Sequence, residues 1–161
     1  MPVANPPENM PRISPYLYYE DVAGALAWLS RAFGLKERMR MPGPDGGIAH
    51  AEMEFADGVV MMGSPAPDYR NPKRLGGATQ SLYVYTDEVD KHFRRAKEAG
   101  AKIVQEPTDQ FYGDRNYAAE DPEGHVWYFA EHVREMTPED MKNSDAVRVA
   151  VSPGAARGIV P

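Results

Sequence analysis

The feature that most constrains the fold of this chain is an internal repeat. When Tyr19 is placed on Tyr85, the sequence aligns with itself without a gap, and six further identities fall in the same register: Asp21 with Asp87, Gly34 with Gly100, Lys36 with Lys102, Gly47 with Gly113, Glu54 with Glu120 and Gly58 with Gly124. Extended runs, helical periodicity and glycine turns also recur in the same order in both halves. The sequence therefore predicts two copies of one supersecondary unit.

Each half predicts the order strand, helix and three strands. In the first half a strand at residues 16–19 precedes a helix that Asp21 caps and Gly34 ends. The apolar face of this helix has helical spacing and consists of Val22, Leu26, Leu29 and Phe33. Strands are expected at 35–41, 48–55 and 59–63, and the second half repeats the order with a strand at 82–86, a helix at 87–100 and strands at 102–105, 115–119 and 125–130.

The length of 161 residues fits one domain made of these two units. The expected parts of the chain are an extended N-terminal arm at 1–11, unit one at 12–64, a linker at 65–79, unit two at 80–132, a short C-terminal helix at 137–142 and a disordered tail at 143–161. The arm and the linker are rich in proline, and Pro138 after Thr137 is typical of a helix start. The domain itself spans residues 12–142.

Charge and composition argue against several classes of function. The 18 Lys and Arg residues are outnumbered by 24 Asp and Glu residues, and no basic run is present, so nucleic acid is not an expected partner. No apolar stretch approaches the roughly 20 residues of a membrane helix, and the first residues lack the pattern of a signal peptide, so a cytoplasmic protein is expected. The absence of cysteine excludes disulfides and thiolate metal sites.

Several short motifs lie in the order and at the spacing found in a known superfamily. The segment 19–21 (Tyr-Glu-Asp) opens the first predicted helix, 121–125 (Asp-Pro-Glu-Gly-His) opens the last strand, and 137–139 (Thr-Pro-Glu) follows it. With its paired units, the chain resembles the vicinal oxygen chelate superfamily, which includes glyoxalase I, the bleomycin resistance proteins and the extradiol dioxygenases. The segments 47–52 and 111–115 resemble the glyoxalase/bleomycin-resistance-like branch.

The resemblance implies an α+β fold in which two tandem β-α-β-β-β units form a concave mixed sheet. In metal-dependent members of the superfamily, four His or Glu side chains point into this cup and chelate a divalent ion. The positions that match them here are Ser14, Met62, Ser81 (or Gln80) and Tyr128. A hydroxyl, a thioether and a phenol do not replace nitrogen or anionic oxygen ligands. No cofactor is therefore expected, and the resemblance points to the metal-free binding members.

His50 and Glu52 keep a different chemistry open. They are two residues apart on a predicted strand and so share one face, opposite Ala51 and Met53. With His132 or Glu120 they would form an off-pattern metal site or an acid-base pair. The alternatives are polar contacts to a ligand, or a structural hydrogen-bonded pair near the sheet edge.

The remaining candidates are mostly aromatic. The cup is expected to be lined by tyrosines, namely Tyr16, Tyr18, Tyr83, Tyr112, Tyr117 and Tyr128, with Met62 as an adaptable apolar contact. Tyrosine also simply favours half-buried strands, and a slip of one residue around Ser81 would invert the face. Arg115 is expected either to hold an anionic group or to pair with Asp114 or Glu120. His125 is expected to pack toward the helices, and His92 to lie on the surface of its helix, solvated or partly covered.

Two hypotheses about function follow. The first is a metal-independent binding protein of the resistance or sequestration type, a homodimer whose crevices hold a small aromatic or cationic organic molecule. Dimerisation is expected because a half-cup leaves edges and an open face that a second copy closes. The second is a lyase, isomerase or dioxygenase with a displaced site around His50 and Glu52, with or without a metal.

Overall fold

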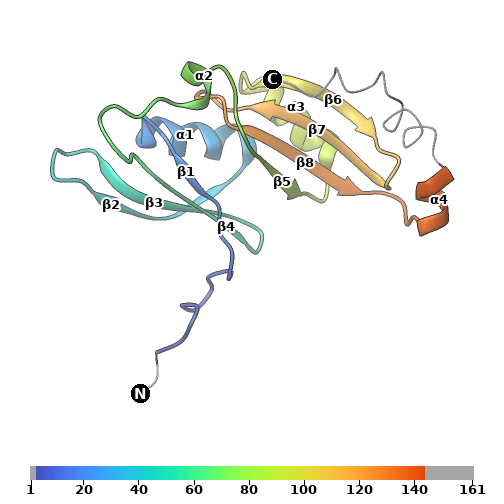
Figure 1. Cartoon of the computed structure of the whole chain (residues 1–161), viewed down its shortest axis with the longest axis horizontal. Coiled ribbons are helices and arrows are strands. Elements are labelled where there is room, and N and C mark those ends of the chain that lie inside the picture. The colour runs from blue at the N-terminus through green and yellow to red at the C-terminus, as the bar shows by residue number, and fades with distance from the viewer. Residues whose placement is uncertain (1–2, 144–161) are drawn as a thin grey trace.

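The structure is a computed structural model that describes residues 3–143. It contains two β-α-β-β-β units that lie side by side (Figure 1), and this confirms the predicted α+β fold. Unit one consists of β1 (Tyr16–Tyr18), α1 (Val22–Phe33), β2 (Lys36–Pro42), β3 (Ile48–Phe55) and β4 (Gly58–Gly63). Unit two consists of β5 (Ser81–Tyr85), α3 (Val89–Glu98), β6 (Lys102–Asp109), β7 (Asp114–Glu120) and β8 (Val126–His132).

Local chemistry explains why α1 begins and ends where it does. The carboxylate of Asp21 accepts a hydrogen bond from the backbone N–H of Gly24 at 2.9 Å and so caps the first turn. Gly34 ends the helix in the left-handed conformation with φ 76°, which glycine adopts without a steric penalty. Both roles were predicted from the residue types and their positions at the ends of the apolar pattern.

Each unit forms its own four-stranded mixed sheet. The strand orders are β1-β4-β3-β2 and β5-β8-β7-β6, with the first strand of each unit parallel to its neighbour and the other pairs antiparallel. Helices α1 and α3 cover one face of the two sheets, and the buried residues between them form one shared core. Phe33, Trp127 and Phe129 lie at its centre, each with no exposed surface. The two units are therefore parts of one domain.

A polar contact joins the ends of the two units. The β7–β8 turn supplies two buried carboxylates, and that of Glu123 accepts hydrogen bonds from the backbone N–H groups of Glu20 and Asp21, both at 2.8 Å. The Asp121 carboxylate accepts one from the Tyr19 hydroxyl at 2.7 Å. Gly124 allows the linker to approach this turn, since a Cβ there would lie 2.7 Å from the backbone nitrogen of Lys73. We call residues 18–21 and 121–125 the inter-unit contact.

The repeat is not gapless, and this corrects the predicted register. Tyr16 and Tyr83 occupy equivalent positions, whereas the gapless alignment that joins Lys36 to Lys102 would place Tyr16 on Leu82. A slip of one residue inverts the face of a strand. Met62 is therefore not in the cup as expected: it pairs with Leu17, has no exposed surface and lies in the core, whereas Met61 faces away from the helices.

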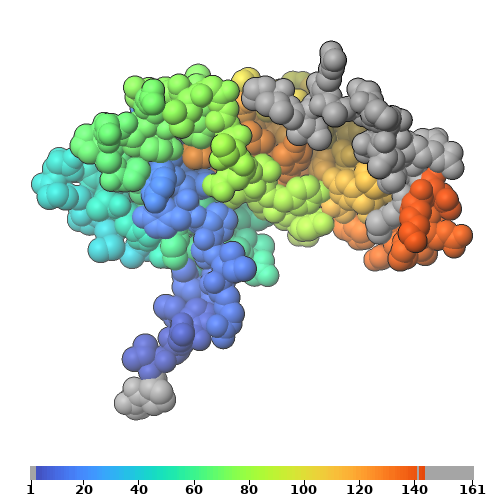
Figure 2. All heavy atoms as spheres, viewed as in Figure 1, coloured from blue at the N-terminus to red at the C-terminus, as the bar shows by residue number. Residues whose placement is uncertain are grey.

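Other segments also differ from expectation. The linker carries a short helix, α2 (Pro72–Leu75), and the strand expected to end at residue 105 continues as β6 to Asp109. Tyr117 is fully buried in the core instead of lining the cup. The part of the chain before β1 projects from the body (Figure 2). Helix α4 (Pro138–Asn143) forms near its predicted position, and the predicted tail beyond residue 143 lies outside the described residues.

Thr137 and Asp140 cap α4 reciprocally. The Thr137 hydroxyl accepts from the backbone N–H of Asp140 at 3.1 Å, and the Asp140 carboxylate accepts from the backbone N–H of Thr137 at 3.0 Å. Within residues 3–143, none of the helices has the length and the apolar character needed to cross a bilayer.

Candidate functional site

Most of the functional candidates lie on the sheet faces opposite the helices, which we call the open faces. Because side chains alternate along a strand and paired residues share a face, the core position of Leu17 and Met62 places Tyr16, Met61 and Glu52 on the open face of unit one. By the same argument, the open face of unit two carries Ser81, Tyr83, Tyr85, Asp114, Asn116, Tyr128 and His132.

A hydrogen-bond network centred on Asp114 organises the open face of unit two. The Asp114 carboxylate accepts from the hydroxyls of Tyr83 and Tyr85 at 2.8 and 2.9 Å, and its other oxygen lies 2.7 Å from Nδ1 of His132. The residue is only 3% exposed, because the tyrosines cover it. A buried carboxylate with three side-chain partners is a rigid anchor for the groups around it.

Asn116 extends this network to the loop before β7. Its amide nitrogen donates to the hydroxyls of Tyr83 and Tyr112 at 3.0 and 2.9 Å, while its amide oxygen accepts from Gln105 and Gln110 at 2.7 and 3.0 Å. The side chain is 2% exposed and uses both protons and both lone pairs. Tyr83 and Tyr112 are therefore held in fixed orientations before any ligand arrives.

The network shifts the acidity of its members. Burial is the main reason that the pKa of Tyr83 is raised, and the bond to Asp114 is the main reason that the pKa of Tyr85 is raised. Burial acts to raise the pKa of Asp114, but the hydrogen bonds that its carboxylate accepts outweigh burial and lower it. The bond to Asp114 raises the pKa of His132. At neutral pH both phenols therefore remain protonated and donate to an ionised carboxylate.

The tyrosine rings of unit two form an angled aromatic wall. The rings of Tyr83 and Tyr128 are nearly parallel, with centroids 6.0 Å apart and an interplanar angle of 16°. Tyr85 meets Tyr83 edge-on, at 5.6 Å and 68°. Tyr85 is 59% exposed and Tyr83 43% exposed, so their rings are available to a ligand.

The open face of unit one carries the predicted pair of His50 and Glu52. Nδ1 of His50 lies 2.9 Å from the Tyr16 hydroxyl, and Nε2 lies 3.5 Å from the Glu52 carboxylate. Arg38 reaches both Glu52 at 3.9 Å and Glu54 at 3.8 Å. His50 and Glu52 are thus part of a row of polar side chains across the sheet, and the guanidinium of Arg38 lies beside the Glu52 carboxylate.

A groove of about 710 Å³ runs between the two units along β1, β4 and β5. Tyr16 lines it from unit one, and Tyr83 and Tyr85 line it from unit two. Ser14 and Ser81, two of the predicted contact residues, also line it. The Ser14 hydroxyl is buried and has no hydrogen-bond partner among the described residues. The groove has the volume of a site for a small organic molecule.

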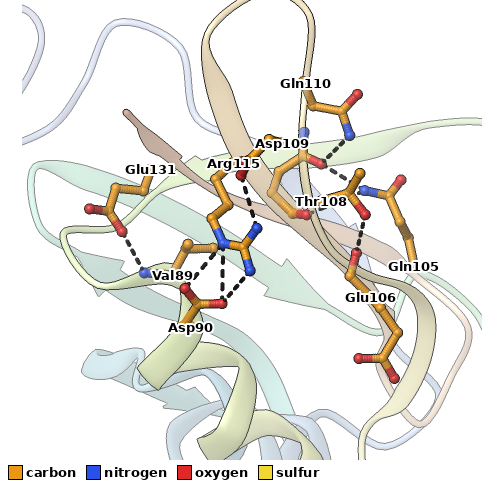
Figure 3. Close-up of polar contacts among 10 residues, drawn as sticks. Val89, Asp90, Gln105, Glu106, Thr108, Asp109, Gln110, Arg115 and Glu131 are labelled. Atoms are coloured by element: carbon orange, nitrogen blue, oxygen red, sulfur yellow. Dashed lines mark hydrogen bonds and ion pairs between the residues drawn. The ribbon is translucent and has the colours of Figure 1, made fainter. Parts of the chain in front are cut away.

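Arg115 has a structural role. It lies between α3 and β6, where its guanidinium donates to Asp90 of the helix and to Asp109 of the strand at 2.9 Å each (Figure 3). These pairings raise the pKa of Arg115 further above its ordinary value. Arg115 thus pairs with carboxylates, as one of its two expected roles requires, but its partners are Asp90 and Asp109 instead of Asp114 and Glu120.

Two further histidines are buried. His125 is only 8% exposed and its Nε2 contacts the backbone oxygen of Tyr18 at 2.9 Å, in agreement with a packing role. The prediction for His92 was wrong, because it is also buried: Nε2 donates to the Phe33 backbone oxygen at 2.8 Å and Nδ1 accepts from the Tyr117 hydroxyl at 2.6 Å. His92 lies three residues after Val89 on the buried side of α3, a helical spacing that could have revealed its position.

Comparison with known proteins assigns the family. Residues 10–129 match the family model of the glyoxalase/bleomycin resistance protein/dioxygenase superfamily, which is most of the chain. The chain belongs to this superfamily. A relative from Mycobacterium tuberculosis H37Rv, described as an uncharacterized protein, is 35% identical over 147 residues, which cover 88% of this chain and 83% of the relative.

Solved structures of superfamily members show the same fold. TioX from Micromonospora sp. ML1 is 35% identical, with a TM-score of 0.64 over 76% of this chain and 99% of TioX. The fosfomycin resistance protein FosX from Listeria monocytogenes is 15% identical, with a TM-score of 0.57 over 81% of this chain and 97% of FosX. At this lower identity the likeness to FosX concerns the fold alone.

The metal positions of the superfamily do not fit a divalent ion in this member. Ser14, Ser81 and Tyr128 offer hydroxyl and phenol oxygens, and Met62 is buried in the core, facing away from the site. Met61, which matches Tyr128 in the observed register, offers only a thioether. Within residues 3–143, no three His, Asp or Glu side chains converge as a ligand set, so His50 and Glu52 lack the expected third ligand. The donor chemistry thus provides no basis for a metal-dependent step.

Sequence reasoning identified part of the site and missed its centre. Tyr83, Tyr112 and Tyr128 lie together as expected, but Asp114 and Tyr85 were not recognised as site residues. Tyr85 follows Tyr83 by two residues, so strand alternation could have placed both on one face. Asp114 offered no comparable signal, because its partners are brought to it only by strand pairing.

Proposed function

We propose that this member of the superfamily is a metal-independent protein that binds a small, flat aromatic or cationic organic molecule. The observation that carries the proposal is the set of tyrosines on the open face of unit two, which Asp114 and Asn116 hold in place at the edge of a groove of about 710 Å³. Preorganised aromatic rings bind flat ligands at a small entropic cost. Polar side chains that converge on one apolar cleft are typical of a small-molecule site.

The proposal includes a homodimer in which a second copy closes the open faces. Large apolar side chains on or next to these faces are exposed in the single chain, among them Met39, Met41 and Tyr16. A contiguous exposed apolar surface is typical of an interface or a ligand groove. In such a dimer the ligand lies in a crevice and is sequestered from solvent, which suits a role in resistance to a toxic molecule.

Calorimetric titration with a panel of flat aromatic compounds, neutral and cationic, tests binding directly. We expect saturable binding without turnover. Tyr128→Ala removes a ring that lies nearly parallel to Tyr83, and it should weaken binding about tenfold, the equivalent of one aromatic contact of about 1.4 kcal/mol. Leu75→Ala, on an exposed residue of α2, is the control and should bind as the unaltered protein does. Protein-dependent consumption of a ligand, or no binding by any compound, would contradict the proposal.

The second candidate is an acid-base enzyme at Tyr16, His50 and Glu52. The specific observation in its favour is the continuous contact from the Tyr16 hydroxyl through His50 to Glu52 on an open face. This candidate requires that a glyoxalase-type or ring-opening substrate be consumed, and that His50→Ala and Glu52→Ala abolish the reaction while the protein stays folded. If both variants retain the activity, the candidate is wrong.

A further inference from the structure

The two units place a pair of tyrosines at equivalent positions but give them different partners. Tyr16 and Tyr18 of β1 correspond to Tyr83 and Tyr85 of β5. In unit two both hydroxyls donate to one buried carboxylate, Asp114. In unit one Tyr16 contacts His50 instead, and the hydrogen bonds described for residues 3–143 include none from the Tyr18 hydroxyl. In this part of the chain, only unit two couples its aromatic wall to a negative charge.

This coupling changes what the rings attract. A phenol that donates its proton to a carboxylate carries more electron density in its ring, and the negative face of an aromatic ring attracts cations. The rings of Tyr83 and Tyr85 meet at 68°, and Tyr128 lies nearly parallel to Tyr83. A cation beside this angled wall therefore faces more than one ring, with Asp114 at the hydroxyl end of two of them.

The charges around the wall favour a cation as well. The groups closest to the Asp114 carboxylate are phenols and His132, and the base nearest in sequence, Arg115, is bound to Asp90 and Asp109. The bond to Asp114 raises the pKa of His132, so the two side chains form an ion pair while His132 is protonated. Asp114 supplies an uncompensated negative charge to the wall once His132 has lost its proton at higher pH. The whole chain carries a formal net charge of −6, which adds attraction at long range.

We propose that the open face of unit two is a site for an organic ammonium, a tertiary or quaternary cation held on the rings of Tyr83, Tyr85 and Tyr128. This inference rests on the proposed function and narrows it, because it names the charge of the ligand and the unit that recognises that charge. Tyr83 and Tyr85 also line the groove, so an aromatic body attached to the ammonium group has space along the boundary between the two units. Asp114 acts through the rings and contributes charge without direct contact.

A pair of isosteric probes tests the charge without changing the shape of the ligand. The cation is para-(hydroxymethyl)phenyltrimethylammonium and the neutral isostere is para-tert-butylbenzyl alcohol. In calorimetric titrations of the full chain we expect the cation to bind about 5- to 30-fold more tightly, the range of a cation-π contact that is partly shielded from water. Equal affinities would overturn the inference and leave the proposed function intact. If neither probe binds, both the inference and the proposed function fail.

Three variants locate the effect. Tyr85→Phe keeps the ring but removes its bond to Asp114, and Asp114→Asn removes the charge. Each should lower the affinity for the cation at least threefold more than the affinity for the neutral isostere. Tyr69→Phe is the matched control, because it also removes one hydrogen bond of a tyrosine hydroxyl. That bond goes to the backbone oxygen of Tyr18 in unit one, at 3.0 Å. Equal losses in Tyr85→Phe and Tyr69→Phe would overturn the assignment to unit two. Since Tyr85 is largely exposed, Tyr85→Phe should fold even if Asp114→Asn does not.

Discussion

Removal of the Asp121 carboxylate should be among the most damaging single substitutions in this chain. Its Oδ1 accepts from the backbone N–H groups of Glu123 and His125, both at 3.0 Å. Its Oδ2 accepts from the Tyr19 hydroxyl at 2.7 Å and from the indole nitrogen of Trp127 at 3.2 Å. The carboxylate therefore shapes the β7–β8 turn and also ties it to unit one.

The magnitude follows from these four partners. Tyr19 and Trp127 have no exposed surface, so in Asp121→Ala their donors stay buried without an acceptor, at about 1–3 kcal/mol each. The two backbone donors add further loss, although bonds to one group are not additive. We expect the free energy of unfolding to fall by at least about 4 kcal/mol, a large part of the roughly 5–15 kcal/mol that holds a domain together. Asp121→Asn keeps the Oδ1 bonds and should cost about 2 kcal/mol.

Chemical unfolding followed by tryptophan fluorescence measures this loss. Asp57→Ala is the matched control, because Asp57 lies in the corresponding β3–β4 turn of unit one but is exposed, and it should change the unfolding free energy by less than about 0.5 kcal/mol. A loss below about 1.5 kcal/mol for Asp121→Ala, or a loss equal to that of the control, would refute the reasoning that this carboxylate couples the units.

Four further predictions concern pH, backbone, metal and assembly. Burial lowers the pKa of His92, so at mildly acidic pH the imidazole takes up a proton more readily in the unfolded chain than in the folded one. The free energy of unfolding should therefore fall as the pH drops below about 6.5, and it should fall less steeply in His92→Gln. Denaturant titrations near pH 7.5 and near pH 5.5 measure the difference. Gly113→Ala should lower the melting temperature by more than about 2 °C in calorimetry, because Gly113 has φ 101° and a Cβ there would overlap the Arg134 backbone oxygen. Protein equilibrated separately with zinc, nickel, manganese and iron should retain no stoichiometric metal in elemental analysis, and one retained equivalent would contradict metal independence. Sedimentation should give twice the mass of the chain, and a monomer at micromolar concentration would remove the dimer from the proposal.

The fold could be predicted because its signals are local. Asp21 caps a helix through its own side chain, and Gly34 ends the helix through its own backbone, so neither role depends on distant residues. The motif at residues 121–125 was recognised by its resemblance to a family, and the structure supplies the physical reason for the motif. Its carboxylates satisfy backbone and side-chain donors at the boundary between the units.

The faces of the strands were harder to predict, because they depend on register. The alignment that joins Lys36 to Lys102 is correct for that strand but places Tyr16 on Leu82, although its equivalent is Tyr83, so a gapless alignment is wrong by one position in some strands. One residue is enough to exchange the two faces of a strand, and it placed Met62 in the cup instead of the core. Short sequence patterns do not report such a shift.

The Asp114 network could not be predicted, because its members are distant in sequence. Residues 83, 85, 114 and 132 meet only when β5, β8 and β7 pair in the observed register. Single residues such as Tyr83 could be named as candidates from residue type and strand parity. Asp114, their common partner, could not be named in this way, because nothing near it in the sequence distinguishes it from any other acidic residue at the end of a strand.

The comparison of the two units explains why the fold and the site differ in predictability. Both units bury apolar side chains against a helix, and packing fixes those positions tightly. The open faces are not constrained in this way, so equivalent positions have diverged: His50 of unit one corresponds to Asn116 of unit two, and each contacts the tyrosine at the equivalent place. The two units thus share the scaffold and the tyrosines, while the polar partners of these tyrosines differ between the units.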